Sequence, residues 1–147
     1  MEHLSGNIYR NARLTAGLTQ ERWSEHLGIS PDSVRKYESG EMIPGDEVVI
    51  RMTEVSGQMI LPYWHLTHKS RIAASILPEI MEEQTLPQAV LGLLIQIEDF
   101  QDSGMKNLLR IAADGKIDLT EERDYDEALA QLSELIRRAY AIGYAKE

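Results

Sequence analysis

Two short amphipathic segments between residues 18 and 40, joined by a glycine, constrain the fold of this chain more than any other feature. The first begins at Thr19, whose hydroxyl group can cap a helix, and its apolar residues Trp23 and Leu27 lie four positions apart on one face. Gly28 ends it, because the left-handed conformation that commonly follows a helix costs glycine no steric clash. The pattern predicts a short helix that stops at Gly28.

The second segment begins within two residues of this glycine. Ser30 offers another capping hydroxyl, and Pro31 fits a first helical turn, where its missing N–H group is not needed. Val34 and Tyr37 share the inward face, and Gly40 closes the helix. Two helices joined by a short turn that contains glycine form a helix-turn-helix unit, whose second helix is suited to a DNA major groove.

Composition excludes several other classes of protein. The 147 residues include no cysteine, which excludes a disulfide scaffold, a thiolate zinc site and a cysteine nucleophile. No signal peptide is visible at the N-terminus, and the longest apolar run, at 89–97, is far shorter than the ~20 residues that span a bilayer. We expect a soluble, cytoplasmic protein that does not enter a membrane.

The net charge of −9 is unevenly distributed. Residues 1–70 hold 7 Lys/Arg and 9 Asp/Glu, whereas residues 71–147 hold 8 and 15. The helix-turn-helix half is therefore nearly neutral and not basic. Because non-specific DNA affinity comes from neutralising phosphates, this half should bind DNA weakly as a single copy.

Apolar periodicity and helix-stop signals predict helices in the rest of the chain as well. They are expected at 5–16, 46–56, 58–68, 86–101, 105–113 and 125–145. With the two central helices, these ranges predict an all-α fold.

A resemblance to a known family is carried by an ordered set of residues. The set is Arg13, Gly17-Leu18-Thr19-Gln20-Glu21, Leu27-Gly28-Ile29-Ser30, Ser33-Val34, Tyr37-Glu38-Ser39-Gly40 and Pro44. On these positions, residues 8–66 resemble the Cro/CI-type (XRE) helix-turn-helix family of bacterial and phage repressors. Two positions depart from the family pattern: Trp23-Ser24 replaces the usual Leu-Ala pair, and Ser56 replaces an apolar residue.

The resemblance implies a five-helix, lambda-repressor-like DNA-binding domain at about 1–68. It implies a sequence-specific transcriptional regulator that binds double-stranded DNA as a homodimer, on two half-sites about one helical turn apart. A separate helical C-terminal domain is expected at about 72–147. That half resembles, more loosely, a helical extension of some bacterial regulators.

The resemblance also assigns roles to individual residues. The outward positions at the start of the reading helix are Pro31, Asp32, Ser33, Arg35 and Lys36. Asp32 could accept a hydrogen bond from cytosine N4, and Lys36 could donate to guanine O6 and N7. Gln20 corresponds to a phosphate contact at a helix N-terminus, and Ser39 is a second phosphate candidate. Arg13 and Glu38 correspond to an ion pair that orients the reading helix.

The C-terminal half has two features that point to a partner. The helix at 86–101 is apolar nearly all round, so it must be covered on every side. The last helix has Leu129, Leu132, Ile136, Ala139 and Gly143 in 3,4 spacing, the seam of paired helices. Either this seam or the surface around Trp64 could supply a dimer contact. Two alternatives stay open: an antitoxin-like regulator whose acidic C-terminal half binds a protein partner, and a protein-interaction module that has lost DNA binding.

Other chemistry finds little support. His65 and His68 have a spacing that could hold a metal, but no third ligand is evident. Residues 114–121 match only the second half of a calcium-binding loop, since Arg110 and Ala112 replace its first carboxylates. The chain has no glycine-rich phosphate loop and no nucleophile motif. We therefore expect no enzymatic activity, no cofactor and no metal.

Overall fold

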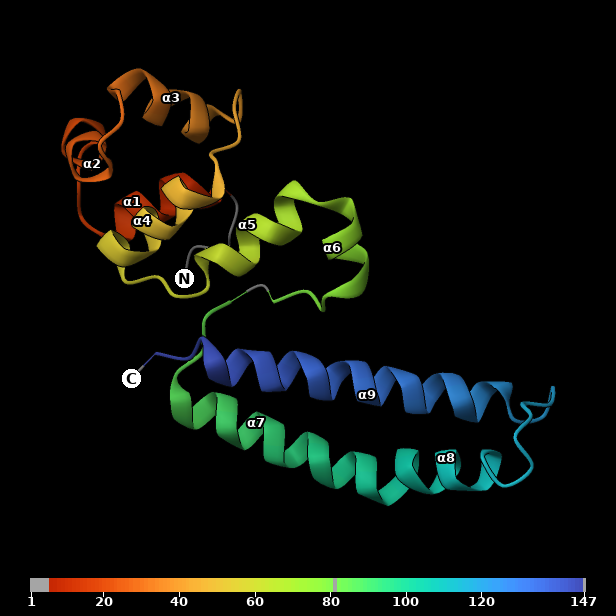
Figure 1. The fold of residues 1–147 in the computed structure, drawn as a ribbon. Coiled ribbons are helices and arrows are strands. Elements are labelled where there is room, and N and C mark those ends of the chain that lie inside the picture. Colours follow the sequence, from red (N-terminus) through yellow and green to blue (C-terminus); the bar gives the residue numbers. More distant parts are fainter. Residues whose placement is uncertain (1–5, 81, 147) are drawn as a thin grey trace. The chain divides into compact units, whose positions relative to one another are not determined.

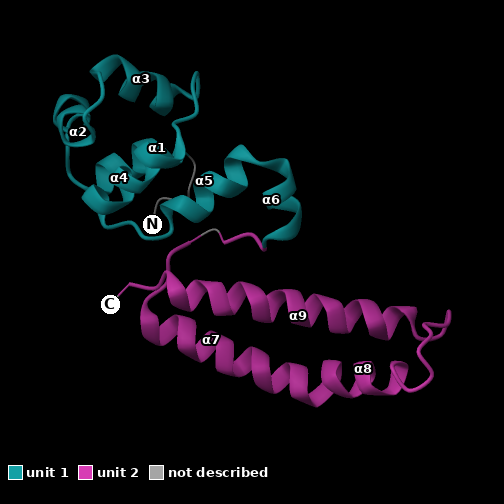
Figure 2. Cartoon of the chain, viewed as in Figure 1, with its two compact units in different colours: residues 1–77 teal, residues 78–147 magenta. Residues whose placement is uncertain are grey.

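The computed structural model of the protein describes residues 6–80 and 82–146. These residues form two compact units, 1–77 and 78–147, which Figure 2 colours separately. Within the described residues, one isolated bridge between Thr85 and Lys146 is the sole extended pairing, and all other regular structure is helical. The all-α prediction is confirmed.

The first unit contains the five expected helices and one more (Figure 1). They are α1 (Ile8–Thr15), α2 (Gln20–Leu27), α3 (Pro31–Ser39), α4 (Asp46–Ser56), α5 (Leu61–Lys69) and α6 (Arg71–Ile76). The short α6 was not expected from the sequence. It follows α5 at once because the hydroxyl of Ser70 caps it, accepting from Ala73 N at 3.1 Å. The compact units consequently divide after Leu77, later than the boundary at 68–72 that the sequence suggested.

Two helices of this unit begin later than expected. Asn7 caps α1, its side-chain oxygen accepting from the backbone N–H groups of Tyr9 and Arg10 at 3.0 and 3.2 Å. The expected start at residue 5 lies outside the described residues. Helix α5 begins at Leu61, not at residue 58.

A single apolar core holds α1 to α5 together. Its buried members are Tyr9, Ala12, Trp23, Leu27, Val34, Tyr37, Val49, Met52 and Leu61. Full burial of a large apolar side chain contributes about 1.5–3 kcal/mol, so these residues are a major favourable contribution to the folding of the unit. Trp23, which departs from the family pattern, is fully buried in the core. Its neighbour Ser24 satisfies its own hydroxyl by donating to Glu21 O at 2.7 Å.

The second unit is an antiparallel helical hairpin (Figure 1). One arm is formed by α7 (Leu86–Asp99), the π-helical turn η1 (Phe100–Gly104) and α8 (Met105–Ile111), and the other arm is α9 (Glu122–Gly143). The sequence predicted a break between 101 and 105, and this was wrong. The first arm is continuous, because a π turn accommodates extra residues without ending a helix.

Backbone hydrogen bonds join the two arms at the end of the hairpin opposite its turn. The backbone N–H of Leu86 donates to Lys146 O, and that of Lys146 donates to Gln84 O, both at 2.9 Å. Further along, the guanidinium group of Arg138 occupies the space that a Cβ atom on Gly92 would take. No helix of the described residues is at once long enough and apolar enough to cross a membrane.

Candidate nucleic-acid interface

The local sequence fixes both ends of the helix-turn-helix. The hydroxyl of Thr19 accepts from Arg22 N at 3.3 Å at the start of α2, and that of Ser30 accepts from Ser33 N at 3.1 Å at the start of α3. Gly28 ends α2 with φ of 63°, a left-handed conformation that glycine adopts without strain. These caps set the short turn that places α3 across α2.

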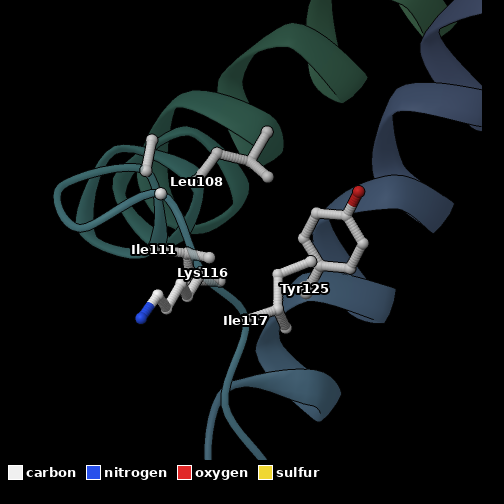
Figure 3. Close-up of a pocket in the computed structure, with 7 residues that line it drawn as sticks. Leu108, Ile111, Lys116, Ile117 and Tyr125 are labelled. Atoms are coloured by element: carbon white, nitrogen blue, oxygen red, sulfur yellow. The ribbon is translucent and has the colours of Figure 1, made fainter.

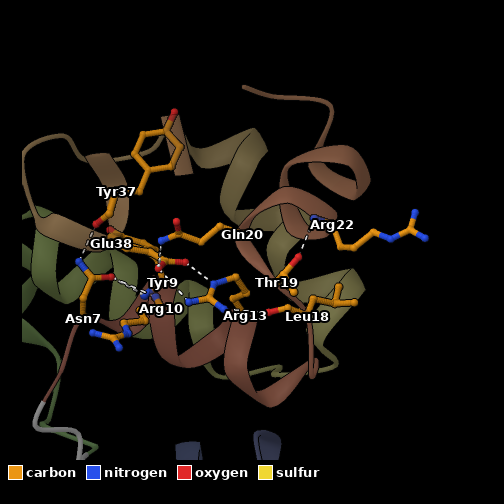
Figure 4. Close-up of polar contacts among 10 residues, drawn as sticks. All are labelled: Asn7, Tyr9, Arg10, Arg13, Leu18, Thr19, Gln20, Arg22, Tyr37 and Glu38. Atoms are coloured by element: carbon orange, nitrogen blue, oxygen red, sulfur yellow. Dashed lines mark hydrogen bonds and ion pairs between the residues drawn. The ribbon is translucent and has the colours of Figure 1, made fainter. Parts of the chain in front are cut away.

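The orientation of α3 is held by the ion pair of Arg13 and Glu38. Arg13 donates from Nε to Glu38 Oε1 at 2.6 Å and from Nη2 to Glu38 Oε2 at 3.0 Å (Figure 4). Two parallel hydrogen bonds fix the orientation of the guanidinium group relative to the carboxylate. Its third nitrogen, Nη1, donates to Leu18 O at 2.8 Å. The two side chains are only 10% and 6% exposed. The hydrogen bond to Glu38 raises the pKa of Arg13, so the guanidinium stays charged.

Gln20 belongs to the same network. Its Nε2 donates to Glu38 Oε2 at 2.8 Å and thereby ties the first turn of α2 to the last turn of α3. A primary amide has two N–H groups, so one donor remains for an external acceptor. The residue that the resemblance assigns to phosphate binding therefore also has a partner inside the protein.

Asn7 is a further positioning residue, one that the sequence analysis did not single out. Its Nδ2 donates to Tyr37 O at 2.6 Å, which attaches the start of α1 to α3 (Figure 4). The available signal was an asparagine directly before an apolar helical run, which is a preferred helix cap.

The exposed start of α3 carries three charged side chains that interact with one another. Asp32 pairs with Arg35, and with Lys36 Nζ at 2.9 Å. The hydrogen bond from Lys36 lowers the pKa of Asp32, and the same contact raises the pKa of Lys36. The three groups together carry a net charge of about +1, so DNA would have to compete with Asp32 for both cations.

The two serines of the predicted site are engaged locally. The hydroxyl of Ser33 lies 2.9 Å from that of Ser30 in the cap of α3. Ser39 donates to Lys36 O at 3.1 Å and accepts from Glu41 N at 3.4 Å, in the turn after α3. Ser39 is exposed, and its hydroxyl stabilises the end of the helix.

The possible metal ligand His65 has protein partners at both ring nitrogens. Nδ1 lies 2.9 Å from the hydroxyl of Tyr9, and Nε2 lies 3.2 Å from Asp46 Oδ1. Asp46 also accepts from Lys69 at 2.7 Å. His65 is 4% exposed, so this contact joins α1, α4 and α5. Over residues 6–80 and 82–146, no three potential ligands cluster as a metal site requires.

The acidic turn at 114–121 uses its carboxylates on its own backbone. Asp118 Oδ1 accepts from the hydroxyl of Thr120 at 2.5 Å, and also from Thr120 N at 2.7 Å and Glu121 N at 3.1 Å. The hydroxyl bond, followed by the backbone bonds, lowers the pKa of Asp118. These bonds order the turn that precedes α9.

A small hollow lies beside this turn, at the far end of the hairpin (Figure 3). Its volume is about 270 Å³, and it is lined by Leu108, Ile111, Ala112, Gly115, Lys116, Ile117 and Tyr125. Ligand sites usually combine a larger volume with several convergent polar groups. In Figure 3 the ammonium group of Lys116 points away from Tyr125. The hollow therefore lacks the features of a ligand site.

Comparison with known proteins gives one match. The family model described as helix-turn-helix matches residues 10–55, which run from α1 to the last turn of α4. Neither curated proteins nor solved structures yield a match to the chain.

Proposed function

From the helix-turn-helix domain of the Cro/CI type (XRE family) that the chain carries, we propose that it binds specific DNA sequences through α3. Domains of this type are the DNA-binding domains of transcription regulators. The observation that carries the proposal is the locked orientation of α3. Arg13, Glu38 and Gln20 hold its last turn. In its first two turns the side chains other than the buried Val34 are at least partly exposed, namely those of Pro31, Asp32, Ser33, Arg35 and Lys36. An exposed first turn on a rigidly placed helix is what major-groove reading requires.

Base contacts are assigned to the first turn of α3. Lys36 and Arg35 can donate to guanine O6 and N7, and Asp32 can accept from cytosine N4. Ser33 can contact either kind of base edge. Since Asp32 already pairs with both cations, each base contact replaces an internal ion pair. The discrimination gained per contact should therefore lie at the low end of the usual ~1–3 kcal/mol.

Phosphate contacts are assigned to the ends of the two helices. Gln20 stands in the first turn of α2, where free backbone N–H groups and the helix dipole favour an anion. Its second amide hydrogen can reach a phosphate while the first stays on Glu38. Ser39, in the turn after α3, is the second candidate.

The weak charge of the first unit supports action as a homodimer. Residues 1–77 contain eight Lys/Arg and nine Asp/Glu, so one copy has little electrostatic attraction for DNA. Two copies on adjacent half-sites would combine two weak contacts into one strong one. The proposal places the protein in the cytoplasm with the chromosome, as a repressor or activator without enzymatic activity.

Selection from a randomised duplex library, followed by fluorescence anisotropy at several salt concentrations, tests the proposal. We expect an enriched sequence, and at least about tenfold weaker binding by a Gln20→Ala/Lys36→Ala variant that keeps its circular dichroism spectrum. Arg123→Ala, which removes one exposed cation from the second unit, is the matched control and should bind normally.

Two outcomes would overturn it. One is equal loss of binding in the Arg123→Ala control, which would mean that affinity follows total charge. The other is the absence of binding to any duplex at about 50 mM salt, where phosphate contacts are strongest. The second outcome would favour a protein-interaction module, for which the acidic second unit is the best support.

A further inference from the structure

The hairpin of the second unit buries almost no large side chain between its arms. The buried residue of α7 is Ala89, and those of α9 are Ala128 and Ala141. Among the three α-helices of the hairpin, the one large buried side chain is Ile111 of α8, near the turn end. By contrast, the first unit buries nine apolar side chains in one core. Because a layer of two helices cannot enclose a core, stable folds add a second layer to it. The hairpin therefore needs a covering surface.

The position of this covering surface is indicated by apolar side chains that remain exposed on the hairpin. We use the name hairpin face for six residues: Leu86, Val90, Leu94 and Ile97 of α7, and Leu129 and Ile136 of α9. Their exposed fractions range from 37% to 57%. At 3.6 residues per turn, the four residues of α7 fall within an arc of about 80°, and the two of α9 within about 20°.

Both stripes lie on the same flank of the hairpin. Ala89 and Gly92 lie on the side of α7 that faces α9. Ala128 and Gln131 lie on the side of α9 that faces the first arm. In each helix the apolar stripe lies about a third of a turn away from the side that faces the other arm. The rotation has the same sense in both helices when each is followed from its N-terminus. The two helices are antiparallel (Figure 1). For antiparallel helices, an equal rotation in the same sense carries both stripes to one side.

The two flanks of the hairpin differ in charge. Residues 86–97 contain no charged side chain on either flank, so the difference comes from α9, whose two apolar positions lie away from its ion pairs. On the opposite flank, Arg123 pairs with Glu127 at 2.9 Å, and Arg137 Nε donates to Glu134 at 2.7 Å. Depletion of charge is the compositional mark of an interface core.

We propose that the hairpin face is the homodimer interface, where a second copy of this chain packs its own hairpin face to complete a four-helix bundle. This inference rests on the proposed function in one respect, since it supplies the interface of the proposed dimeric regulator. A two-fold axis pairs the face with itself, which suits a surface that is apolar throughout and has no opposite charges to align.

The area of the hairpin face is sufficient for such a dimer. Six half-exposed aliphatic side chains offer roughly 500 Å² per copy, or about 1,000 Å² for two copies, which is the lower bound for a specific interface. Side chains at the rim would add to this area. Removing this area from water favours association, and salt at physiological concentration screens the repulsion between exposed acidic side chains that lie more than about 8 Å apart.

Sedimentation equilibrium of the full chain tests the proposal with a readout of mass, independent of DNA binding. We expect a dimer for the native protein, and at least a hundredfold weaker self-association for Leu94→Glu and for Ile136→Glu. The matched control is Ile95→Glu: Ile95 is 52% exposed on the same helix, but it lies on the charged flank. It should dimerise normally.

A monomer at all concentrations would overturn the proposal, as would a dimer that survives both variants or one that Ile95→Glu also dissociates. If a variant unfolds its hairpin, hydrogen exchange of the native protein decides. Protection of the α7 and α9 amides should fall on dilution, because the second layer is lost, while protection of the first unit stays unchanged. Protection of α7 and α9 that is independent of concentration contradicts the dimer.

Discussion

The side-chain amide of Gln20 donates a 2.8 Å hydrogen bond to Glu38, on the carboxylate oxygen that also receives Arg13 Nη2. One buried carboxylate thus connects α1, α2 and α3. The residue assigned to phosphate, the ion pair and the orientation of the reading helix form a single network. A change at Glu38 should therefore affect both stability and DNA binding.

Glu38→Ala should destabilise the first unit by about 3 kcal/mol, because it leaves the buried Arg13 guanidinium without its carboxylate. Urea unfolding followed by circular dichroism measures the loss. Glu41→Ala, at an exposed position just after α3, is the control and should change stability little. An unfolding midpoint that is equal in the native protein and Glu38→Ala would contradict a stabilising role of the Arg13–Glu38 ion pair.

Asp32→Asn should strengthen binding to random-sequence duplex DNA, because Arg35 and Lys36 lose their internal carboxylate and become available to phosphates. The logarithm of the binding constant should fall more steeply with the logarithm of salt concentration, by about one unit of slope. Discrimination between sequences should fall at the same time, since the acceptor for cytosine is lost. Anisotropy titrations at several salt concentrations measure both effects, and an unchanged slope would contradict the competition between Asp32 and DNA.

Tyr9→Phe should destabilise the first unit by about 1–3 kcal/mol, because the buried Nδ1 of His65 loses its partner. Burial raises the pKa of Tyr9 to about 12, so spectrophotometric titration should show one tyrosine of the native protein ionising later than the others. This late component should be missing in Tyr9→Phe. Its persistence in the variant would assign it to another tyrosine.

The second unit should lose stability in acid. Hydrogen bonding to Arg137 lowers the pKa of Glu134 from 4.5 to about 2. A lowered carboxyl pKa means that the folded form binds the proton less well than the unfolded form. The contribution of ionised Glu134 to the stability of the unit is therefore present above pH 4.5 and is lost as the pH falls toward 2. Hydrogen exchange of α9 across this range measures the effect. Glu134→Gln should flatten the dependence, and an equally steep loss in the variant would point to other carboxylates.

The sequence by itself determined the elements whose causes are local. Thr19, Gly28 and Ser30 set the ends of α2 and α3 through interactions within four residues, and the resemblance placed the five helices of the DNA-binding domain. The short α6 and the continuous first arm of the hairpin were missed, because a six-residue helix has little periodicity and a π turn leaves no clear sequence signal. In the surface around Trp64, one candidate for the dimer contact, Trp64 itself is buried and its neighbour Leu66 is 48% exposed.

Only the tertiary structure decided which polar groups meet and which apolar ones stay exposed. Gln20 and Glu38 are 18 residues apart, and nothing local predicts that the amide donates to this carboxylate. Likewise, Leu129 and Leu132 belong to one seam in the sequence, but Leu132 turns partly inward whereas Leu129 remains 40% exposed. Side-chain periodicity defines a face of a helix, but which face is covered depends on the rotation of that helix against its neighbour, and this rotation is fixed by packing between distant residues.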